Sequence, residues 1–202
     1  MATRVCILDY GSGNVKSVYN LVTTLAEHVE ISNEPRAIQE ATHLILPGVG
    51  AFGASMIKIK NRLPLGIIET DVRNGKPFLG ICVGLQVLAE KGYEFGEHPG
   101  LGWIPGIVDR IDSHGLPLPH IGWNDIMIKG NSPLLQGLNK QDFYFVHSFV
   151  FRARSDDSVM ATACYGEEFA CVLNKGNVYG VQFHPEKSQK AGRVLVQNFL
   201  RL

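Results

Sequence analysis

The sequence predicts an α/β fold with an open, mostly parallel central sheet, flanking helices and an antiparallel extension in the C-terminal half. In the first half, short apolar runs alternate with helical patterns, as in a parallel sheet covered by helices. Two runs, His-Leu-Ile-Leu at 43–46 and Pro-Phe-Leu-Gly-Ile at 77–81, lack polar alternation, which predicts central strands buried on both faces. After Ile104, runs of Val, Ile, Phe and Tyr punctuated by Gly, Asn and Pro predict antiparallel hairpins.

The expected strands are apolar runs, and the expected helices carry helically spaced apolar residues. In the first half we expect strands at 5–9, 29–32, 43–46 and 78–81 and helices at 14–27, 64–73 and 83–89. In the second half we expect strands at 107–111, 142–151, 159–163, 169–174 and 178–183 and a helix at 190–200. A tight turn is expected at 175–177, and the Pro/Gly-rich stretch 115–122 is expected to be a loop crossing the sheet edge.

The chain is long and apolar enough to bury a sizeable core. Its 202 residues are 45% hydrophobic and 19% charged, which excludes a disordered or fibrous protein and predicts one domain over residues 1–202. Nineteen Lys and Arg balance nineteen Asp and Glu, so no overall charge attracts the molecule to nucleic acid or to an acidic membrane. We therefore expect neither as a partner.

Signals of export and of metal binding are absent from the sequence. It does not open with a basic segment followed by a long apolar run, and no stretch approaches the roughly 20 apolar residues that span a bilayer. The four cysteines have no C-x-x-C spacing, which fits neither a disulfide framework nor a zinc site. We expect a cytoplasmic protein without a bound metal, in which one cysteine can act as a nucleophile.

The sequence Gly-Ile-Cys-Val-Gly at 80–84 lies between a predicted strand and a predicted helix. It matches the G-x-nucleophile-x-G elbow, with Cys82 as the nucleophile. Flanking glycines are needed because the sharp turn strains the backbone of the nucleophile and crowds its neighbours. The start of the helix favours the thiolate, and the N–H of Val83 is one donor for an oxyanion. The alternative is a buried structural cysteine, which does not explain both glycines.

A cysteine nucleophile needs a base, and the base needs a group that orients it. His184-Pro185-Glu186 follows an apolar run near the end of the chain. Pro185 favours an extended His184, so that His184 and Glu186 project to the same side and hydrogen-bond. We therefore predict a Cys82–His184–Glu186 triad. Apart from His147, the other histidines have no comparable neighbour and are interpreted as structural.

Two glycine-rich turns are secondary candidates. Leu-Pro-Gly-Val-Gly at 46–50 ends a predicted strand at the sheet edge that carries Cys82, so Val49 and Gly50 are expected to provide a second oxyanion donor. Asp-Tyr-Gly-Ser-Gly-Asn at 9–14 suggests a dinucleotide fingerprint, but Lys16 stands where the third glycine is required. No G-x-x-x-x-G-K-[ST] phosphate loop occurs, and we expect no cofactor.

Together these residues resemble a known family. Gly-Ile-Cys-Val-Gly-Leu-Gln at 80–86, with His184-Pro185-Glu186, is similar to the class I (triad) glutamine amidotransferases. Within that family, further motifs resemble the glutaminase subunits of imidazole glycerol phosphate synthase. They cover essentially the whole chain: DYGSGN (9–14), LPGVGAF (46–52), GLGWIPG (100–106), PHIGWN (119–124), YFVHS (144–148) and QFHPEKS (182–188). The resemblance implies a flavodoxin-like arrangement of the sheet.

The resemblance implies that glutamine is hydrolysed through a cysteine thioester. Cys82 would attack the side-chain amide, and His184, oriented by Glu186, would protonate the leaving ammonia. Backbone N–H groups at Val83 and 49–50 would hold the oxyanion. The residues that the resemblance implies in glutamine binding are Gly50, Gln86, Glu94, His147 and Ser148.

A partner subunit is also implied. Ammonia in neutral water is mostly ammonium, which is not nucleophilic, so the glutaminase must discharge it into an enclosed path. In the family the receiver is a (β/α)₈ cyclase that forms imidazole glycerol phosphate and an aminoimidazole carboxamide ribonucleotide in histidine biosynthesis. Asn14, Trp123 and Lys187 match positions at the heterodimer interface. The 47–50 loop resembles an element that rearranges before turnover, so we expect low activity for the isolated chain.

Three alternatives stay open from the sequence. A paralogous glutaminase of the same type would supply ammonia to another synthase, for example one that aminates a sugar precursor. A stand-alone cysteine hydrolase or peptidase would have an open cleft and need no partner. A non-catalytic scaffold would be expected to lack a member of the triad, and all three are present.

Overall fold

The computed structural model describes residues 3–202 and confirms the α/β class with a largely parallel central sheet. Met1 and Ala2, the start of the segment considered above for an export signal, lie outside the described residues. Five neighbouring strands run parallel in the order β2-β1-β3-β4-β14. Their bounds are β1 (Arg4–Leu8), β2 (His28–Ser32), β3 (His43–Gly48), β4 (Phe78–Cys82) and β14 (Val178–Val181).

Beyond β14 the sheet continues as the predicted antiparallel extension. Its main strands are β13 (Glu167–Lys175), β11 (Phe149–Ala153) and β7 (Gly106–Arg110), joined by the short β5 (Lys91–Gly92) and β6 (His98–Pro99). Beside β13 lie β12 (Val159–Tyr165) and β9 (Met127–Ile128). A separate two-stranded sheet pairs β8 (His120–Asp125) with β10 (Asp142–His147). The turn expected at 175–177 joins β13 to β14.

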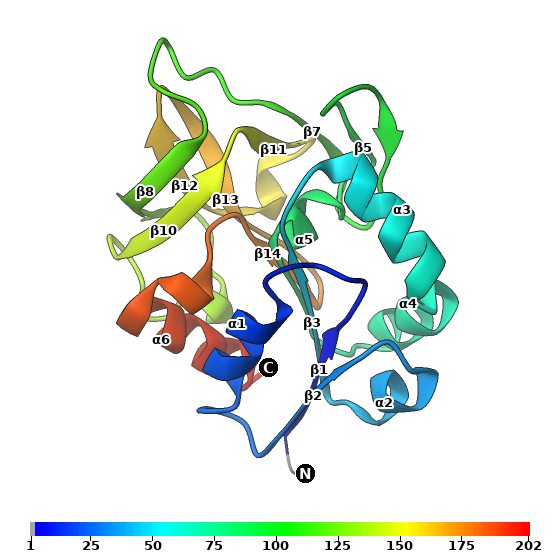
Figure 1. The fold of residues 1–202 in the computed structure, drawn as a ribbon. Helices are drawn as coiled ribbons and strands as arrows, with labels where there is room; N and C mark the ends of the chain where they lie inside the picture. The colour runs from blue at the N-terminus through cyan, green and yellow to red at the C-terminus, as the bar shows by residue number, and fades with distance from the viewer. Residues whose placement is uncertain (1–2) are drawn as a thin grey trace.

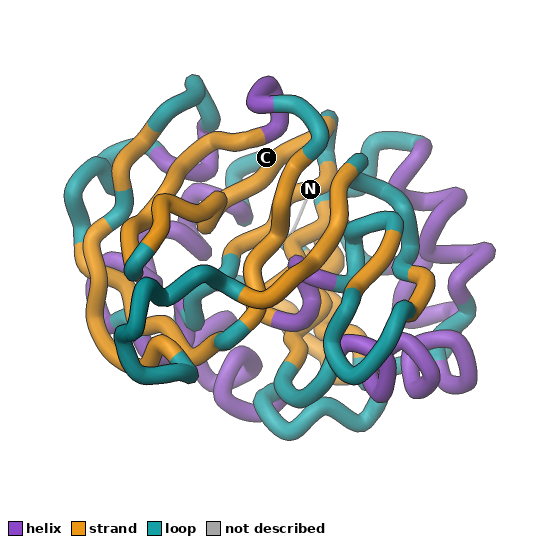
Figure 2. The backbone as a smooth tube through the Cα atoms, turned by 90° about the horizontal axis from the view of Figure 1, so that it is seen from above, coloured by secondary structure: helices purple, strands orange, loops and turns teal. Residues whose placement is uncertain are grey.

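Helices cover both faces of the parallel strands, with α1 and α6 on one side and α2, α3 and α4 on the other (Figure 1). Seen from above, the strands run through the middle of the molecule (Figure 2). None of the helices in residues 3–202 is both long and apolar enough to cross a membrane. The helices are α1 (Val15–Val22), α2 (Pro35–Glu40), α3 (Phe52–Arg62), α4 (Leu65–Arg73), α5 (Val83–Gln86) and α6 (Gln189–Phe199), with 3₁₀ turns η1 (Pro133–Leu135), η2 (Asp156–Ser158) and η3 (Pro185–Lys187).

β3 and β4 lie at the centre of the parallel strands, as their sequences predicted. Every residue of both strands is buried. A fully buried aliphatic side chain stabilises the fold by about 1.5–3 kcal/mol, so a shift of either strand would expose several such side chains at once. The register between the two strands, which sets the position of Cys82, is therefore strongly fixed.

Two predicted helices are shorter in the structure, and two other helices were not predicted. The helix expected at 83–89 is the short α5, which ends at Gln86. The helix expected at 14–27 ends at Val22, where the hydroxyls of Thr23 and Thr24 bond back to the carbonyls of Tyr19 and Leu21 and end the helix. The helices α2 and α3 were not predicted. The first has only six residues, and the second mixes small and β-branched residues that weaken the helical pattern.

Two strand expectations also needed correction. The run 142–151 is not one strand, because the chain leaves the small sheet after β10 and enters the main sheet with β11, with Ser148 between them. The stretch 115–122 is a loop only as far as Pro119, since β8 begins at His120. Its Pro and Gly content hid that strand: Gly122 has a φ of 143° and is accommodated inside β8.

The carboxyl ends of β3, β4 and β14 meet at one edge of the sheet. Gly48 is level with Cys82, and Ile81 is level with Val181. The loops that follow these strands therefore bring the 47–50 loop, the Cys82 turn and His184 together. Ligands of open α/β sheets bind at this edge.

Candidate active site

Cys82 occupies the sharp turn between β4 and α5, as predicted. Its φ of 55° lies in the left-handed region, which costs a residue with a side chain about 1–3 kcal/mol. The residue is only 4% exposed, yet it lines a cavity of about 400 Å³. The strained turn thus presents the thiol to a partly open cavity of the size of a small metabolite.

The two glycines of the elbow are required by close packing. A Cβ at Gly80 would collide with the backbone carbonyl of Gly84. A Cβ at Gly84 would collide with the carbonyl of Leu46 in β3. Neither glycine has a positive φ; the strained residue is Cys82 itself. The crowding that the sequence predicted around the nucleophile is therefore confirmed.

His184 and Glu186 form the hydrogen bond that their spacing predicted. His184 has extended backbone angles, and its N–H donates to the carbonyl of Tyr144 at 2.9 Å. Its Nδ1 lies 2.8 Å from Oε1 of Glu186. Because an ionised carboxylate only accepts, Nδ1 must carry a proton, which leaves Nε2 for the cavity and Cys82.

The charged forms of His184 and Glu186 stabilise each other. Burial alone would lower the pKa of His184, but contact with the Cys82 sulfur and the Glu186 carboxylate raises it to about 10. Burial likewise opposes ionisation of Glu186, yet the hydrogen bond from His184 and its charge hold the pKa of this carboxyl below its ordinary value. The geometry therefore favours an imidazolium and a carboxylate at neutral pH.

A chain of hydrogen bonds connects Glu186 to the 47–50 loop. Asn14 donates from Nδ2 to Glu186 Oε1 at 3.2 Å and accepts from the Ser12 hydroxyl at 3.0 Å. The Ser12 oxygen in turn accepts the backbone N–H of Val49 at 3.1 Å. The backbone N–H of Val49, a predicted oxyanion donor, is thus occupied by its hydrogen bond to Ser12 in this conformation. Gly50 has a φ of 103° and lines the cavity.

Asn14 lies inside the molecule rather than on an open surface. It is 7% exposed, and its side chain is occupied by Ser12 and Glu186. The sequence assigned it to a partner interface, whereas its contacts here position Glu186. Neither Ser12 nor this connection was singled out, because the two partners of Asn14 lie at opposite ends of the chain.

Gln86 and Glu94 both line the cavity, where they were expected to hold a ligand. Gln86 Nε2 donates to the carbonyl of Phe149 at 3.0 Å and to Oε1 of Gln182 at 3.1 Å. Only its amide oxygen is left to face a ligand. Glu94 Oε2 accepts the N–H of Phe52 at 2.8 Å, at the start of α3. Gln86 thus offers an acceptor, and Glu94 offers one remaining carboxylate oxygen.

His147 forms a wall of the cavity but has no ring nitrogen to offer. Nδ1 lies 3.1 Å from the carbonyl of Phe149, and Nε2 lies 3.0 Å from Nδ1 of His120. Burial, followed by the neighbouring His120, lowers the pKa of His147 to about 3. Burial also lowers the pKa of His120 to about 4. Both rings are neutral, and Ser148 lines the cavity beside them.

An aromatic and cationic group adjoins the cavity through Lys187. Trp123 is 48% exposed and packs edge-on against Tyr144, with ring centroids 5.8 Å apart. Lys187 lines the cavity, and its Nζ lies 5.6 Å from the centroid of the Tyr144 ring. The structure therefore brings together two of the predicted interface residues, around a tyrosine that the sequence motif contained but that we did not single out.

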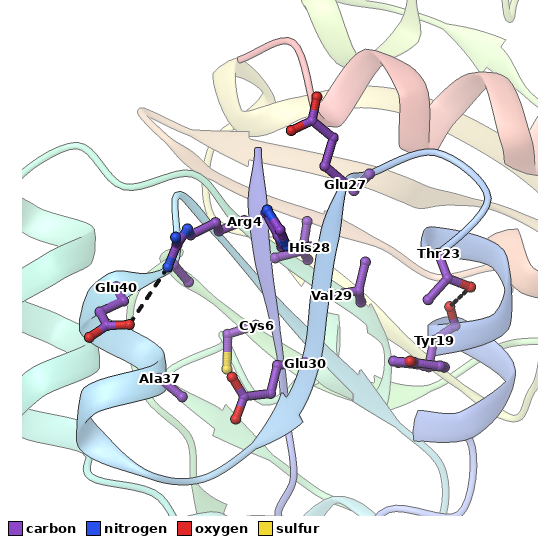
Figure 3. Close-up of a pocket in the computed structure, with 13 residues that line it drawn as sticks. Arg4, Cys6, Tyr19, Thr23, Glu27, His28, Val29, Glu30, Ala37 and Glu40 are labelled. Carbon is purple, nitrogen blue, oxygen red and sulfur yellow. Dashed lines mark hydrogen bonds and ion pairs between the residues drawn. The ribbon is translucent and has the colours of Figure 1, made fainter. Parts of the chain in front are cut away.

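A second hollow of about 510 Å³ is lined by residues of β1, β2, α1 and α2 and lacks comparable chemistry (Figure 3). Arg4 and Glu40 form an ion pair there at 3.7 Å. Its cysteine, Cys6, is buried, and burial raises the pKa of its thiol to about 12. Within residues 3–202, no group of three or more His, Cys, Asp or Glu side chains could hold a metal ion. The Cys82 cavity is therefore the candidate active site.

Comparisons with known proteins identify the family of the chain. The model of the family "Glutamine amidotransferase class-I" matches residues 6–202. A relative named imidazole glycerol phosphate synthase subunit HisH, from Aquifex aeolicus, is 44% identical over 98% of this chain and 96% of its own. The protein of the same name from Salinibacter ruber is 46% identical over 97% and 93%.

The fold is shared more widely than the sequence. The structure of PurLQS from Thermotoga maritima superposes with a TM-score of 0.75 at 19% identity, covering 100% of this chain and 99% of that one. A crystal structure of a glutamine amidotransferase gives 0.76 at 21% identity, covering 98% and 97%. With the family match over nearly its whole length, the chain belongs to the class-I glutamine amidotransferases, in the group of the HisH subunits of imidazole glycerol phosphate synthase.

Proposed function

We propose that this chain hydrolyses glutamine to glutamate and ammonia and delivers the ammonia to a cyclase subunit in histidine biosynthesis. The observation that carries the chemistry is the buried His184–Glu186 pair facing Cys82 in one cavity. The identity to HisH subunits over nearly the full length supports the pathway. A cavity of about 400 Å³ suits a single amino acid better than a peptide.

Catalysis begins with attack by the Cys82 thiolate on the side-chain amide carbon of glutamine. The C–S bond forms, and the carbonyl electron pair moves to oxygen, which becomes an oxyanion. The His184 imidazolium then gives its Nε2 proton to the nitrogen, the C–N bond breaks, and ammonia leaves. Glu186 keeps Nδ1 protonated throughout and stabilises the charge on the ring.

The γ-glutamyl thioester is hydrolysed through the same groups in reverse. His184, now neutral, removes a proton from water as the oxygen attacks the thioester carbon. The C–S bond breaks, and its electron pair returns to Cys82. The thiolate–imidazolium pair is thereby restored, and glutamate leaves.

The oxyanion needs backbone donors that are directed into the cavity. The N–H of Val83 follows Cys82 at the start of α5 and is one donor. The second donor belongs to the 47–50 loop, where the Val49 N–H is bonded to Ser12. We propose that this loop rearranges before turnover and that the isolated chain is therefore a slow glutaminase.

We assign the partner-facing surface to the cavity mouth. Trp123 and Lys187 are exposed and both contact the half-buried Tyr144, and Lys187 lines the cavity from which ammonia would leave. Trp and Tyr are enriched in protein interfaces and among the residues that contribute most to binding. The partner is a (β/α)₈ cyclase, and Lys187 is available for an ion pair across the interface.

The test is glutamate release from glutamine by the purified chain, measured alone and with a cyclase subunit of imidazole glycerol phosphate synthase carrying its ribonucleotide ligand. We expect slow release by the chain alone and strong stimulation by the liganded cyclase. If glutamine is hydrolysed but the cyclase neither binds nor stimulates, the pathway assignment is wrong, and a paralogous partner becomes the better proposal. Absence of release under every condition would contradict the chemistry.

A further inference from the structure

Gln182 is a fully buried polar residue in direct contact with the nucleophile. Its exposure is 0%, and its Nε2 lies 3.8 Å from Sγ of Cys82, a hydrogen-bond distance for sulfur. We propose that Gln182 is a further catalytic residue, whose side-chain N–H holds the Cys82 sulfur both as the attacking thiolate and as the leaving group of the thioester. This inference rests on the proposed function, because it concerns the same sulfur.

The backbone places Gln182 level with Cys82. Val181 and Ile81 are partners in the parallel β14–β4 pair, so the next residues of the two strands lie side by side. The N–H of Gln182 donates to the carbonyl of Cys171 in β13 at 2.9 Å. The backbone of Gln182 is thus held by β13 just beyond the end of β14, and its buried side chain is held between Gln86 and the sulfur.

The orientation of the Gln182 amide follows from a chain of contacts that begins at a backbone carbonyl. The carbonyl of Phe149 can only accept, so the group of Gln86 that faces it at 3.0 Å must be the NH₂. The same NH₂ lies 3.1 Å from the near end of the Gln182 amide. That end must therefore be the oxygen, Oε1, because an NH₂ group cannot accept a hydrogen bond from another NH₂ group. The NH₂ of Gln182 is then the group that faces Cys82. The two amides form a directed relay from Phe149 to the sulfur.

A buried amide in this position is costly unless its hydrogen bonds are made. An amide group in an apolar interior without partners costs roughly 1–3 kcal/mol in proteins, and the Gln182 amide avoids this cost only through its contacts with Gln86 and the Cys82 sulfur. Besides His184, the sulfur has a further polar neighbour in the carbonyl of Val146 at 3.9 Å, which can accept from a thiol but cannot stabilise a thiolate. Gln182 supplies an uncharged donor that suits the ionised sulfur.

The donor acts without transferring a proton. In the resting site and during attack, the Gln182 N–H donates a hydrogen bond to the sulfur whose electron pair forms the C–S bond. In thioester hydrolysis, water adds to the carbonyl carbon, its proton goes to His184, and the C–S electron pair returns to sulfur. The returning negative charge is met by the same N–H, which lowers the barrier to loss of the thiolate.

The experiment compares wild type, Gln182→Met and Gln182→Glu, all in a Cys164→Ser background. Cys164 is exposed and does not line the Cys82 cavity, so its replacement removes a competing thiol without changing the cavity wall. The first readout is the pH dependence of Cys82 alkylation by iodoacetamide, followed by mass spectrometry. The second is kcat and KM for glutamine in the complex with the cyclase. Thermal unfolding checks that each variant folds.

Methionine fills a similar volume without a donor, and glutamate is nearly isosteric but replaces the NH₂ with an acceptor oxygen. We expect the pH midpoint of Cys82 alkylation to rise by about one pH unit in Gln182→Met and further in Gln182→Glu. At a pH below the midpoint, a rise of one unit lowers the fraction of thiolate about tenfold. We also expect kcat to fall roughly tenfold with little change in KM, with more γ-glutamyl thioester trapped by acid quenching.

Wild-type midpoints and kcat in either folded variant would overturn the role of Gln182, because a residue that only fills space tolerates both replacements. If Gln182→Met fails to fold, Gln182→Glu decides alone. Alkylation of Cys82 requires no turnover, so this readout tests the role of Gln182 even if the wild-type complex hydrolyses no glutamine. That last result would contradict the proposed function instead.

Discussion

The backbone N–H of Val49 donates to the hydroxyl of Ser12 at 3.1 Å, and this bond couples the 47–50 loop to the triad. The same hydroxyl donates to Asn14, which holds Glu186. One serine therefore contacts both the loop that must supply an oxyanion donor and the residue that positions the triad carboxylate. A change at the loop can reach Glu186 through only two side chains.

Ser12→Ala is expected to raise the glutaminase activity of the isolated chain. The variant frees the Val49 N–H from its present acceptor, and loss of one neutral hydrogen bond shifts a two-state loop roughly 2- to 10-fold. The measurement is glutamate release without cyclase. Ser17→Ala, an exposed substitution on α1, is the matched control and should leave the rate unchanged. An unchanged rate in Ser12→Ala would show that this bond does not restrain the loop. A lower rate would show that the contact of Ser12 with Asn14 outweighs the release of the Val49 N–H.

Asn14 is expected to act through Glu186. Asn14→Leu removes the donor to Oε1, while Oε2 of Glu186 is already buried without a partner. A hydrogen bond to a charged group contributes about 1.5–3 kcal/mol, so kcat in the cyclase complex should fall at least tenfold with KM little changed. Asn14→Asp should be more severe, because it places a like charge beside Glu186. Wild-type kcat in both variants would argue against a positioning role.

The raised pKa of His184 predicts a pH-dependent contribution to stability. The pKa is about 10 in the folded protein against an ordinary value of 6.5, so the folded state binds the proton more tightly. The contribution is complete below pH 6.5 and is lost as pH rises through about 10. Urea unfolding of wild type and His184→Gln at pH 6 and pH 10.5 should show a wild-type advantage that shrinks at the higher pH. An advantage that grows with pH has the wrong sign for this account.

The packing of the elbow is tested by Gly84→Ala, with Gly66→Ala as its control. A Cβ at Gly84 would collide with the carbonyl of Leu46, so Gly84→Ala should cost at least about 3 kcal/mol or prevent folding. A Cβ at Gly66, in α4, meets nothing within 4 Å, and Gly66→Ala should stabilise the fold by up to about 1 kcal/mol. Chemical denaturation of both variants measures the difference. Equal stabilities would contradict the close approach of α5 to β3.

The parts of the fold and site that follow from local patterns were predictable. β3 and β4 are continuous apolar runs, and their burial fixes Cys82 at the edge of the sheet. The His184–Glu186 bond depends on residues two apart, with Pro185 between them. Each of these features is specified within a few neighbouring residues, and the sequence therefore contains them directly.

The contacts that escaped prediction join distant segments. Gln182 reaches Cys82 because β14 pairs in parallel with β4, and Asn14 reaches Glu186 because α1 packs beside η3. Short apolar patterns also concealed the break at Ser148, where the chain changes from one sheet to the other. Such features depend on register and topology, which a single sequence does not determine.

The central claim is that glutamine is cleaved through a covalent bond to Cys82. The most direct test is to mix the cyclase-bound chain with isotopically labelled glutamine, quench in acid, and locate the label by peptide mass spectrometry. The account predicts a γ-glutamyl group on the peptide that contains Cys82, absent from Cys82→Ala, which should release no glutamate. Label on another residue, or full glutaminase activity in Cys82→Ala, would contradict it.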